Sequence, residues 1–396
     1  MQHEYTSGLH PDLLMASISI GILSLLVACR IFSWRIAALL VTARIAIAVL
    51  YYSYPLESRW MLSDDLEYLE VARYLLENGY HWWDILISRQ FHGALFSATG
   101  SHHIAYYWWN LLGFNLFGIH YYSPVFLNIL LTFGTAAALY RIVRLCGFSQ
   151  GYGQAAAAVF LLHPNTIAWS TFTNLKDTMV AFLMAWSLYF VGRLLVRVPM
   201  RARRRLYEAL LLGGAVFVVF FTRFYLPFLL LGVSGLYLLT IWKSRIKYLV
   251  VPLGLGLVLV VYPTIIRAAV RYLDPGAFLY GITQAILSPQ PWSIDPLYSF
   301  LMVSSLVHWA LIVPALLGAI HLFRNYPIAR YFLLYMVVIF IVSAIVTEFK
   351  GPRHRVQMDF LLIWVQFHAV WLGIQLSRAR AKVGPAMGQV LEGRAE

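Results

Sequence analysis

Long uninterrupted apolar runs dominate this chain and restrict it to one kind of fold. A helix needs about 20 apolar residues to cross a bilayer, and runs of this length recur throughout the sequence. They do not alternate polar and apolar residues, which excludes a β-barrel. We expect about eleven membrane-spanning helices, which cover Leu13–Cys29, Ile36–Tyr54, Tyr121–Val143, Gln154–Ser170, Thr178–Val196, Leu206–Thr222, Phe224–Ile241, Tyr248–Ile265, Leu297–Leu322, Ala329–Val346 and Phe360–Leu376.

The composition agrees with an all-α polytopic membrane protein. Hydrophobic residues make up 61% of the chain, against about 45–50% in soluble domains, and the mean hydropathy is +0.71. The net charge is +13, which on a soluble domain would favour nucleic acid as a partner. Here the positions of the charges explain the excess without nucleic acid.

Basic residues fall in alternate loops and predict the orientation. The positive-inside rule assigns such loops to the cytoplasm. They contain Arg30 and Arg35, Arg141 and Arg144, Arg197–Arg205, Lys243–Lys247, Arg324 and Arg330, and Arg378–Lys382. The N-terminus, the loop around Asp64, the Lys176 turn, the Arg267–Ser293 loop and the Lys350–Arg355 turn are then expected to face outward.

The predicted organisation is a single membrane domain over residues 1–376, with a large outer loop at 55–120 and a disordered cytoplasmic tail at 377–396. The apolar segment Ile104–Gly118 is short, so we interpret it as interfacial or re-entrant, with a twelfth span as the alternative. The first apolar run lacks the flanks of a cleaved signal peptide. The two cysteines, Cys29 and Cys146, predict neither a disulfide nor a metal site.

Paired carboxylates in the first outer loop are the clearest chemical feature. Asp64 and Asp65 open a pattern in which apolar residues recur at helical spacing and which ends at Gly79. This predicts an amphipathic helix on the outer leaflet, with glycine suited to the position after its end. Asp64 at the N-cap with Glu67 three residues on is the structural alternative, but it leaves Asp65 unexplained.

Cations in the outward turns are the second feature. They run against the positive-inside bias, and arginine matches phosphate oxygens well; attraction to ordinary anionic headgroups is the alternative. The candidates are Lys176 (with Asp177 beside it), Arg223, Arg267, Arg271, Arg353 and Arg355.

The sequence does not assign a role to the other polar and aromatic residues. His81, His92, His102 and His103 share the first outer loop, but their spacing matches no standard zinc site. For the loop tryptophans an interfacial belt is favoured, and stacking against a sugar is the alternative. Arg44 falls midway along the second span, where a charge is costly and must face the bundle.

Several of these residues resemble the pattern of the GT-C superfamily of membrane glycosyltransferases, closest to the protein mannosyltransferase and aminoarabinose transferase group. The paired acids, Tyr68, Ala72 and Gly79 occur in the family's order. An aromatic segment (Tyr106–Trp108), Phe117–Gly118 and a helix with Tyr140 and Arg144 follow, as they often do in the family. The chain departs from the pattern by an extra helix before the acids and by His102-His103 in place of a proline pair.

The resemblance implies an enzyme of the bacterial inner membrane that moves a sugar from a polyprenyl-phosphate donor to a hydroxyl acceptor on the outer face. We expect Asp64 to act as general base and Asp65 to position the acceptor or tune that base, and two close carboxylates to raise each other's proton affinity. Substrate binding is expected from Glu67, Tyr68, His103, Lys176, Asp177, Arg223, Arg267, Arg271, Arg353 and Arg355. No cofactor is certain, and a divalent metal at the acids is left open. The alternatives are a flippase or exporter of a lipid-linked sugar, which would use the same cations, and a non-catalytic scaffold.

Overall fold

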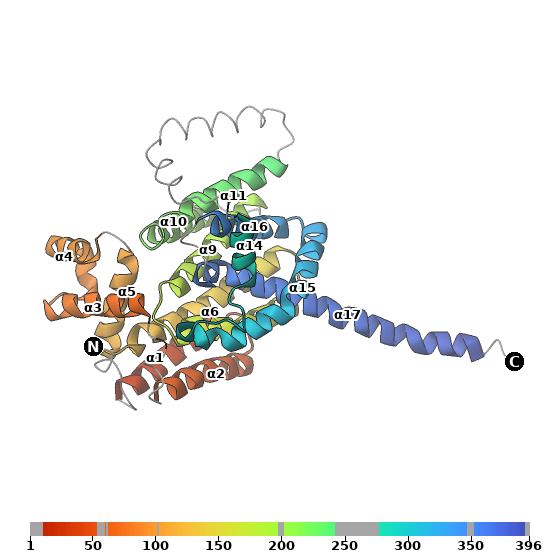
Figure 1. The fold of residues 1–396 in the computed structure, drawn as a ribbon, viewed down its shortest axis with the longest axis horizontal. Coiled ribbons are helices and arrows are strands. Elements are labelled where there is room, and N and C mark those ends of the chain that lie inside the picture. The colour runs from red at the N-terminus through yellow and green to blue at the C-terminus, as the bar shows by residue number, and fades with distance from the viewer. Residues whose placement is uncertain are drawn as a thin grey trace.

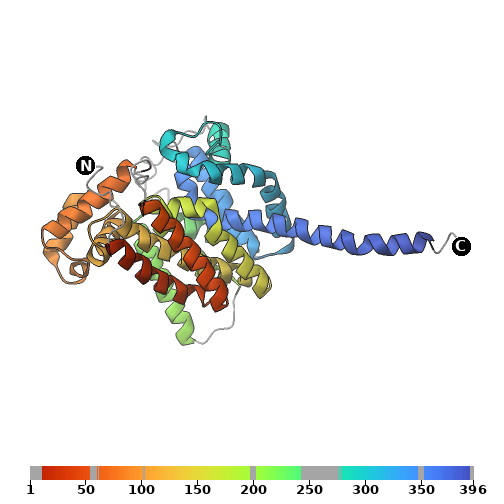
Figure 2. The same cartoon turned by 90° about the horizontal axis from the view of Figure 1, so that it is seen from below.

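The computed structural model describes residues 11–53, 60, 62–100, 103–196, 202–241, 276, 278–346 and 352–392, with side chains up to residue 378. Helices account for nearly all of these residues, and the described part of the chain contains no β-strand (Figures 1 and 2). The all-α prediction is therefore confirmed for this part of the chain. The expected helix over Tyr248–Ile265 lies outside it.

Six of the described helical segments are long and apolar enough to cross a membrane, which supports a membrane protein. They are α1 (Pro11–Ala28), α2 (Trp34–Ser53), α6 (Tyr122–Leu145), α9 (Asp177–Leu195), η5 with α15 (Pro296–Leu301 and Met302–Asn325) and η7 with the first part of α17 (Pro352–Met358 and Asp359–Glu392). The apolar helices α11 (Leu226–Ile241), α14 (Phe278–Leu287) and α16 (Ala329–Ile345) are shorter, and α10 covers Ala202–Phe220. The number of eleven spans stays a prediction, as does the orientation.

One expected span is divided in two. The run Gln154–Ser170 forms α7 (Gln150–Leu162) and α8 (Pro164–Thr171), with His163 between them in an extended conformation at φ −64° and ψ 130°. Proline disfavours helical geometry in the preceding residue but suits the first position of a new helix. Pro164 therefore ends α7 and begins α8.

Helix α6 forms the centre of the bundle, and most of its side chains are buried around the whole circumference, as expected for a core helix. It packs against α1, α5 (Ile104–Phe117), α7 and α9. Helix α5 in turn carries α3 (Ser63–Glu77) on its other side. The ends of α3, α9 and η7 are thereby brought to one region of the bundle.

Two segments at the periphery bear on the sequence-based expectations. Helix α3 buries Asp65, Tyr68, Leu69, Ala72 and Leu75 and is followed by Gly79 at φ +79°, a backbone conformation that favours glycine. Its place on the outer leaflet stays a prediction.

The tail expected to be disordered from residue 377 differs from the structure. Helix α17 continues to Glu392 and projects away from the bundle in both views (Figures 1 and 2). Residues Arg378–Lys382 are all arginine, alanine or lysine, which are good helix formers, so the helix does not end with the apolar run.

Candidate active site

Four turns and helix starts, far apart in the sequence, bring their charged residues together at one end of the bundle. Asp64 comes from the first turn of α3, Lys176 and Asp177 from the start of α9, Arg223 from the turn between α10 and α11, and Arg353 from η7. Asp64 and Arg353 are 289 residues apart in the chain and form an ion pair. Five of the sequence-predicted site residues thus meet in one cluster, which we call the charge cluster.

Arg353 is the junction of the charge cluster. Its Nη1 donates to Asp64 Oδ2 at 2.6 Å, and its Nε donates to Asp177 Oδ2 at 2.8 Å. The remaining nitrogen, Nη2, is buried and has no hydrogen-bond partner among the described residues. One guanidinium therefore joins two carboxylates and keeps a donor unused.

Asp177 and Arg223 form a second, deeper ion pair. Only 2% of the Asp177 side chain and 4% of the Arg223 side chain are exposed. Arg223 also donates to Tyr225 Oη at 3.0 Å and lies 3.1 Å from His354 Nδ1. A buried charge is costly unless it is paired and hydrogen-bonded, so Asp177 with its two arginines is a single electrostatic unit.

Lys176 has no carboxylate in direct contact in the described structure and lies against Tyr68. Its Nζ donates to Tyr68 Oη at 2.8 Å and sits 5.5 Å from the centre of that ring. Burial lowers the pKa of Lys176 to about 7, and the charges of Arg223 and Arg353 act in the same direction. An anion placed beside Lys176 would oppose both effects and favour its charged form.

Asp64 and Asp65 occupy opposite environments. Asp65 is fully buried, accepts a hydrogen bond from Tyr121 Oη at 2.7 Å and from the Leu62 backbone N–H at 3.3 Å. Its second oxygen is buried without a described partner. Burial raises the pKa of Asp65 to about 7, although these hydrogen bonds act against it.

Asp64 keeps 39% of its side chain exposed and faces Arg353. Burial alone would raise the pKa of Asp64, but the charge of Arg353 and the hydrogen bond from it outweigh burial and bring the pKa below its usual value.

These environments correct two sequence-based expectations. The helix start is shifted by two residues, with Leu62 and not Asp64 as N-cap, so the carboxylate that bonds back to the N-cap N–H is Asp65 and not Glu67. The pair also does not raise the pKa of both its members: the pKa of Asp65 rises through burial, and that of Asp64 falls through Arg353. Asp64 is therefore the accessible carboxylate, and Asp65 is the structural one.

Sequence reasoning missed the polar network that holds Asp65. Tyr121 Oη accepts the Asn174 backbone N–H at 3.1 Å, and the Asn174 side chain links Tyr106 Oη (2.7 Å) to Asn110 Oδ1 (2.6 Å). The network ties α5 and α6 to the turn that carries Lys176. Its only sequence signal is that Asn174 stands two residues before Lys176.

Glu67 and His103 lie at the edge of the charge cluster. Glu67 is exposed and accepts a hydrogen bond from Tyr107 Oη. His103 precedes α5 at φ +54°, and its Nδ1 lies 2.8 Å from the Thr222 carbonyl oxygen. Burial lowers the pKa of His103 to about 4, with a contribution from Lys176, so this imidazole is neutral near pH 7 and adds no positive charge.

Arg355 does not join Arg353. It lies 3.4 Å from Asp359 and donates to the Ser288 carbonyl oxygen at 2.8 Å, in a separate buried polar group. Arg267 and Arg271 lie outside the described residues. The partner of Arg44, which the sequence does not indicate, is Ser170 Oγ at 2.5 Å.

The described residues contain no group of three or more His, Cys, Asp or Glu side chains that could hold a metal ion. Asp64 is bound to Arg353, and one oxygen of Asp65 is taken by Tyr121 and Leu62. The paired acids therefore do not fit a metal site in this arrangement.

The buried Asp65 predicts a specific pH dependence of stability. A carboxyl whose pKa is raised on folding stabilises the folded state at low pH, and this contribution is lost as the pH rises from about 4 to about 7. Asp65→Asn removes the titration, so the free energy of unfolding of the wild type should fall relative to that of the variant across this range, by up to ~1.4 kcal/mol per pH unit. The melting temperature of the wild type should fall with it. Thermal unfolding in detergent from pH 4 to 8 measures this, with the exposed Glu77→Gln on the same helix as control; parallel curves for wild type and Asp65→Asn would contradict it.

Comparison with protein-family models, with curated proteins and with solved structures finds no match to this chain.

Proposed function

We propose that this protein is a membrane glycosyltransferase that moves a sugar from a polyprenyl-phosphate donor to a hydroxyl acceptor, at the outward face of a bacterial inner membrane. The observation that carries the proposal is the charge cluster, in which Lys176, Arg223 and Arg353 surround Asp64 and Asp177. The class of donor comes from the sequence resemblance to the GT-C superfamily. The cluster supplies what such a reaction needs: fixed cations beside an accessible carboxylate.

In the proposed reaction, the bond between the sugar's anomeric carbon and the phosphate oxygen breaks, and a bond to the acceptor oxygen forms. The acceptor proton passes to Asp64, and the polyprenyl phosphate leaves with the electron pair of the broken bond. Negative charge therefore grows on the phosphate during the reaction. Preorganised cations that face this charge lower the barrier, and Lys176 and Arg353 are the candidates that lie beside Asp64.

The ion pair between Asp64 and Arg353 gives the donor a second role. While Arg353 is bound to Asp64, the lowered pKa of this carboxyl makes it a weak base. A phosphate that engages Arg353, whose Nη2 is free to donate among the described residues, competes with Asp64 for the guanidinium. The proton affinity of Asp64 then rises as the phosphate binds, so the base becomes effective only when the donor is in place.

Asp64→Asn tests the proposed chemistry. In a deletion strain, wild type should restore a missing envelope sugar, while Asp64→Asn at matched protein level should leave transfer reduced by at least about 100-fold, the lower range for general-base loss. Mass spectrometry of envelope glycans and lipid-linked sugars measures both the product and the accumulated donor. Glu77→Gln, which changes an exposed carboxylate on the same helix, is the matched control. Full restoration by Asp64→Asn would exclude Asp64 as the base and favour the carrier.

Lys176 predicts a pH dependence of donor binding. With its pKa lowered to about 7, Lys176 is charged at pH 6 and largely neutral at pH 8. The affinity for a methyl ester of polyprenyl phosphate, a phosphodiester of constant charge, should fall by about three- to tenfold over this range. In Lys176→Arg the cation stays charged, so the affinity should fall less over this range than in the wild type. Equilibrium binding in nanodiscs measures it, and an equal slope for both proteins would remove Lys176 from the phosphate site.

A further inference from the structure

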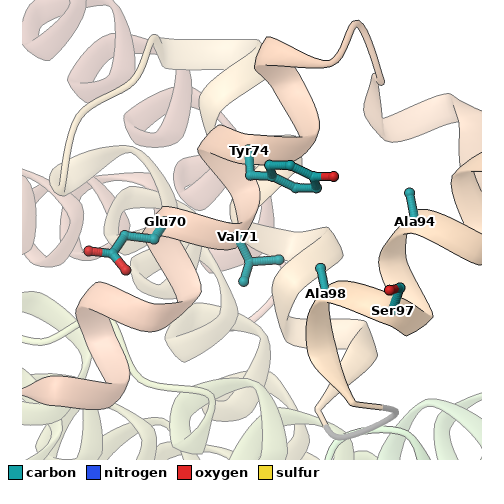
Figure 3. A pocket seen from close by; sticks show the side chains of 6 residues that line it. All are labelled: Glu70, Val71, Tyr74, Ala94, Ser97 and Ala98. Carbon is teal, nitrogen blue, oxygen red and sulfur yellow. The ribbon is translucent and has the colours of Figure 1, made fainter.

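A groove lies between α3 and α4 (Arg89–Thr99), beside the charge cluster but separate from it. Its volume is about 380 Å³, and its lining is Glu70, Val71 and Tyr74 from α3 with Ala94, Ser97 and Ala98 from α4 (Figure 3). A volume in this range suits a small ligand or one part of a larger one. None of the interactions in the charge cluster uses these residues.

The groove lies along the same stripe of α3 as the accessible carboxylate. Asp64, Glu67, Val71 and Tyr74 are spaced at i, i+3, i+7 and i+10, which places them in one line along a helix. Ten residues of helix span about 15 Å. A ligand lying in the groove could therefore extend along α3 past Glu67 and present its end to Asp64.

The side chains that line the groove have the chemistry of a carbohydrate site. Tyr74 is 51% exposed, and its ring extends toward α4 (Figure 3). Ala94 and Ala98 are too small to cover it. An aromatic face accommodates the apolar C–H face of a sugar ring, while the Ser97 hydroxyl can bond to its hydroxyl groups. A prenyl chain would form no hydrogen bond with the Ser97 hydroxyl and would remove it from water.

We infer that the groove between α3 and α4 binds the sugar residues of a glycan acceptor, whose terminal hydroxyl then reaches Asp64. This inference rests on the proposed function and names its acceptor as a glycan of more than one sugar. Tyr74 and Ser97 act here as specificity-determining residues, at a distance from the reacting atoms.

Two substitutions test the groove. Tyr74→Ala removes the stacking surface, and Ala98→Trp fills the groove from an exposed position. Phe96→Ala, which truncates another exposed aromatic residue of this region outside the groove lining, is the control. The full chain in nanodiscs would be assayed for transfer to envelope glycans prepared from the deletion strain, for binding of these glycans without donor, and for binding of the methyl ester of polyprenyl phosphate.

Both groove variants should raise the KM for the glycan and weaken its binding by about tenfold, while phosphodiester affinity and the behaviour of Phe96→Ala stay at the wild-type level. Unchanged glycan KM and binding in both variants would overturn the inference while transfer by wild type upholds the function. If glycan binding depends on Tyr74 but the wild type transfers no sugar, the proposed function is contradicted instead. Loss of phosphodiester binding alone would assign the groove to the donor's prenyl chain and overturn the inference.

Discussion

The arrangement of the candidate site depends on one guanidinium, that of Arg353. It joins Asp64 of α3 to Asp177 of α9, and Asp177 in turn holds Arg223 from the turn between α10 and α11. Removing one partner of a buried ion pair leaves an uncompensated charge and costs about 3–5 kcal/mol. The fold must therefore bring these helix ends together, and the packing of α3 on α5, of α5 on α6 and of α6 on α9 does so. The same bonds leave Asp64 partly exposed, with its pKa lowered by Arg353.

The sequence predicts the helical class and most helix positions because long apolar runs and glycine or proline signals are local. It also singles out the paired acids and the cations that are predicted to face outward, several of which meet in the charge cluster. It does not decide which of the two acids is buried, because consecutive residues of a helix point about 100° apart and the sequence does not fix the residue at which α3 begins. With Leu62 as N-cap, Asp65 faces the core and Asp64 faces the charge cluster.

The sequence also does not decide which of the cations contact the acids. Arg353 and Arg355 are two residues apart in η7, a 3-10 helix with about three residues per turn, so they point in different directions. Arg353 joins Asp64 and Asp177, and Arg355 joins Asp359 and the Ser288 carbonyl oxygen after α14. Tyr121 and Asn174 carry no distinguishing pattern, because their partners lie more than 50 residues away. Only the tertiary structure shows that they hold Asp65.

Competition between Asp64 and a phosphate for Arg353 is the central claim, and one binding measurement tests it directly. Affinity for the methyl ester of polyprenyl phosphate would be measured for wild type, Asp64→Asn and Arg353→Gln in nanodiscs, with melting temperatures to verify folding. We predict that Asp64→Asn binds the phosphodiester more tightly than wild type, because Arg353 loses its competing carboxylate, and that Arg353→Gln binds it at least about tenfold more weakly. Weaker binding by Asp64→Asn, or wild-type binding by a folded Arg353→Gln, would contradict the claim.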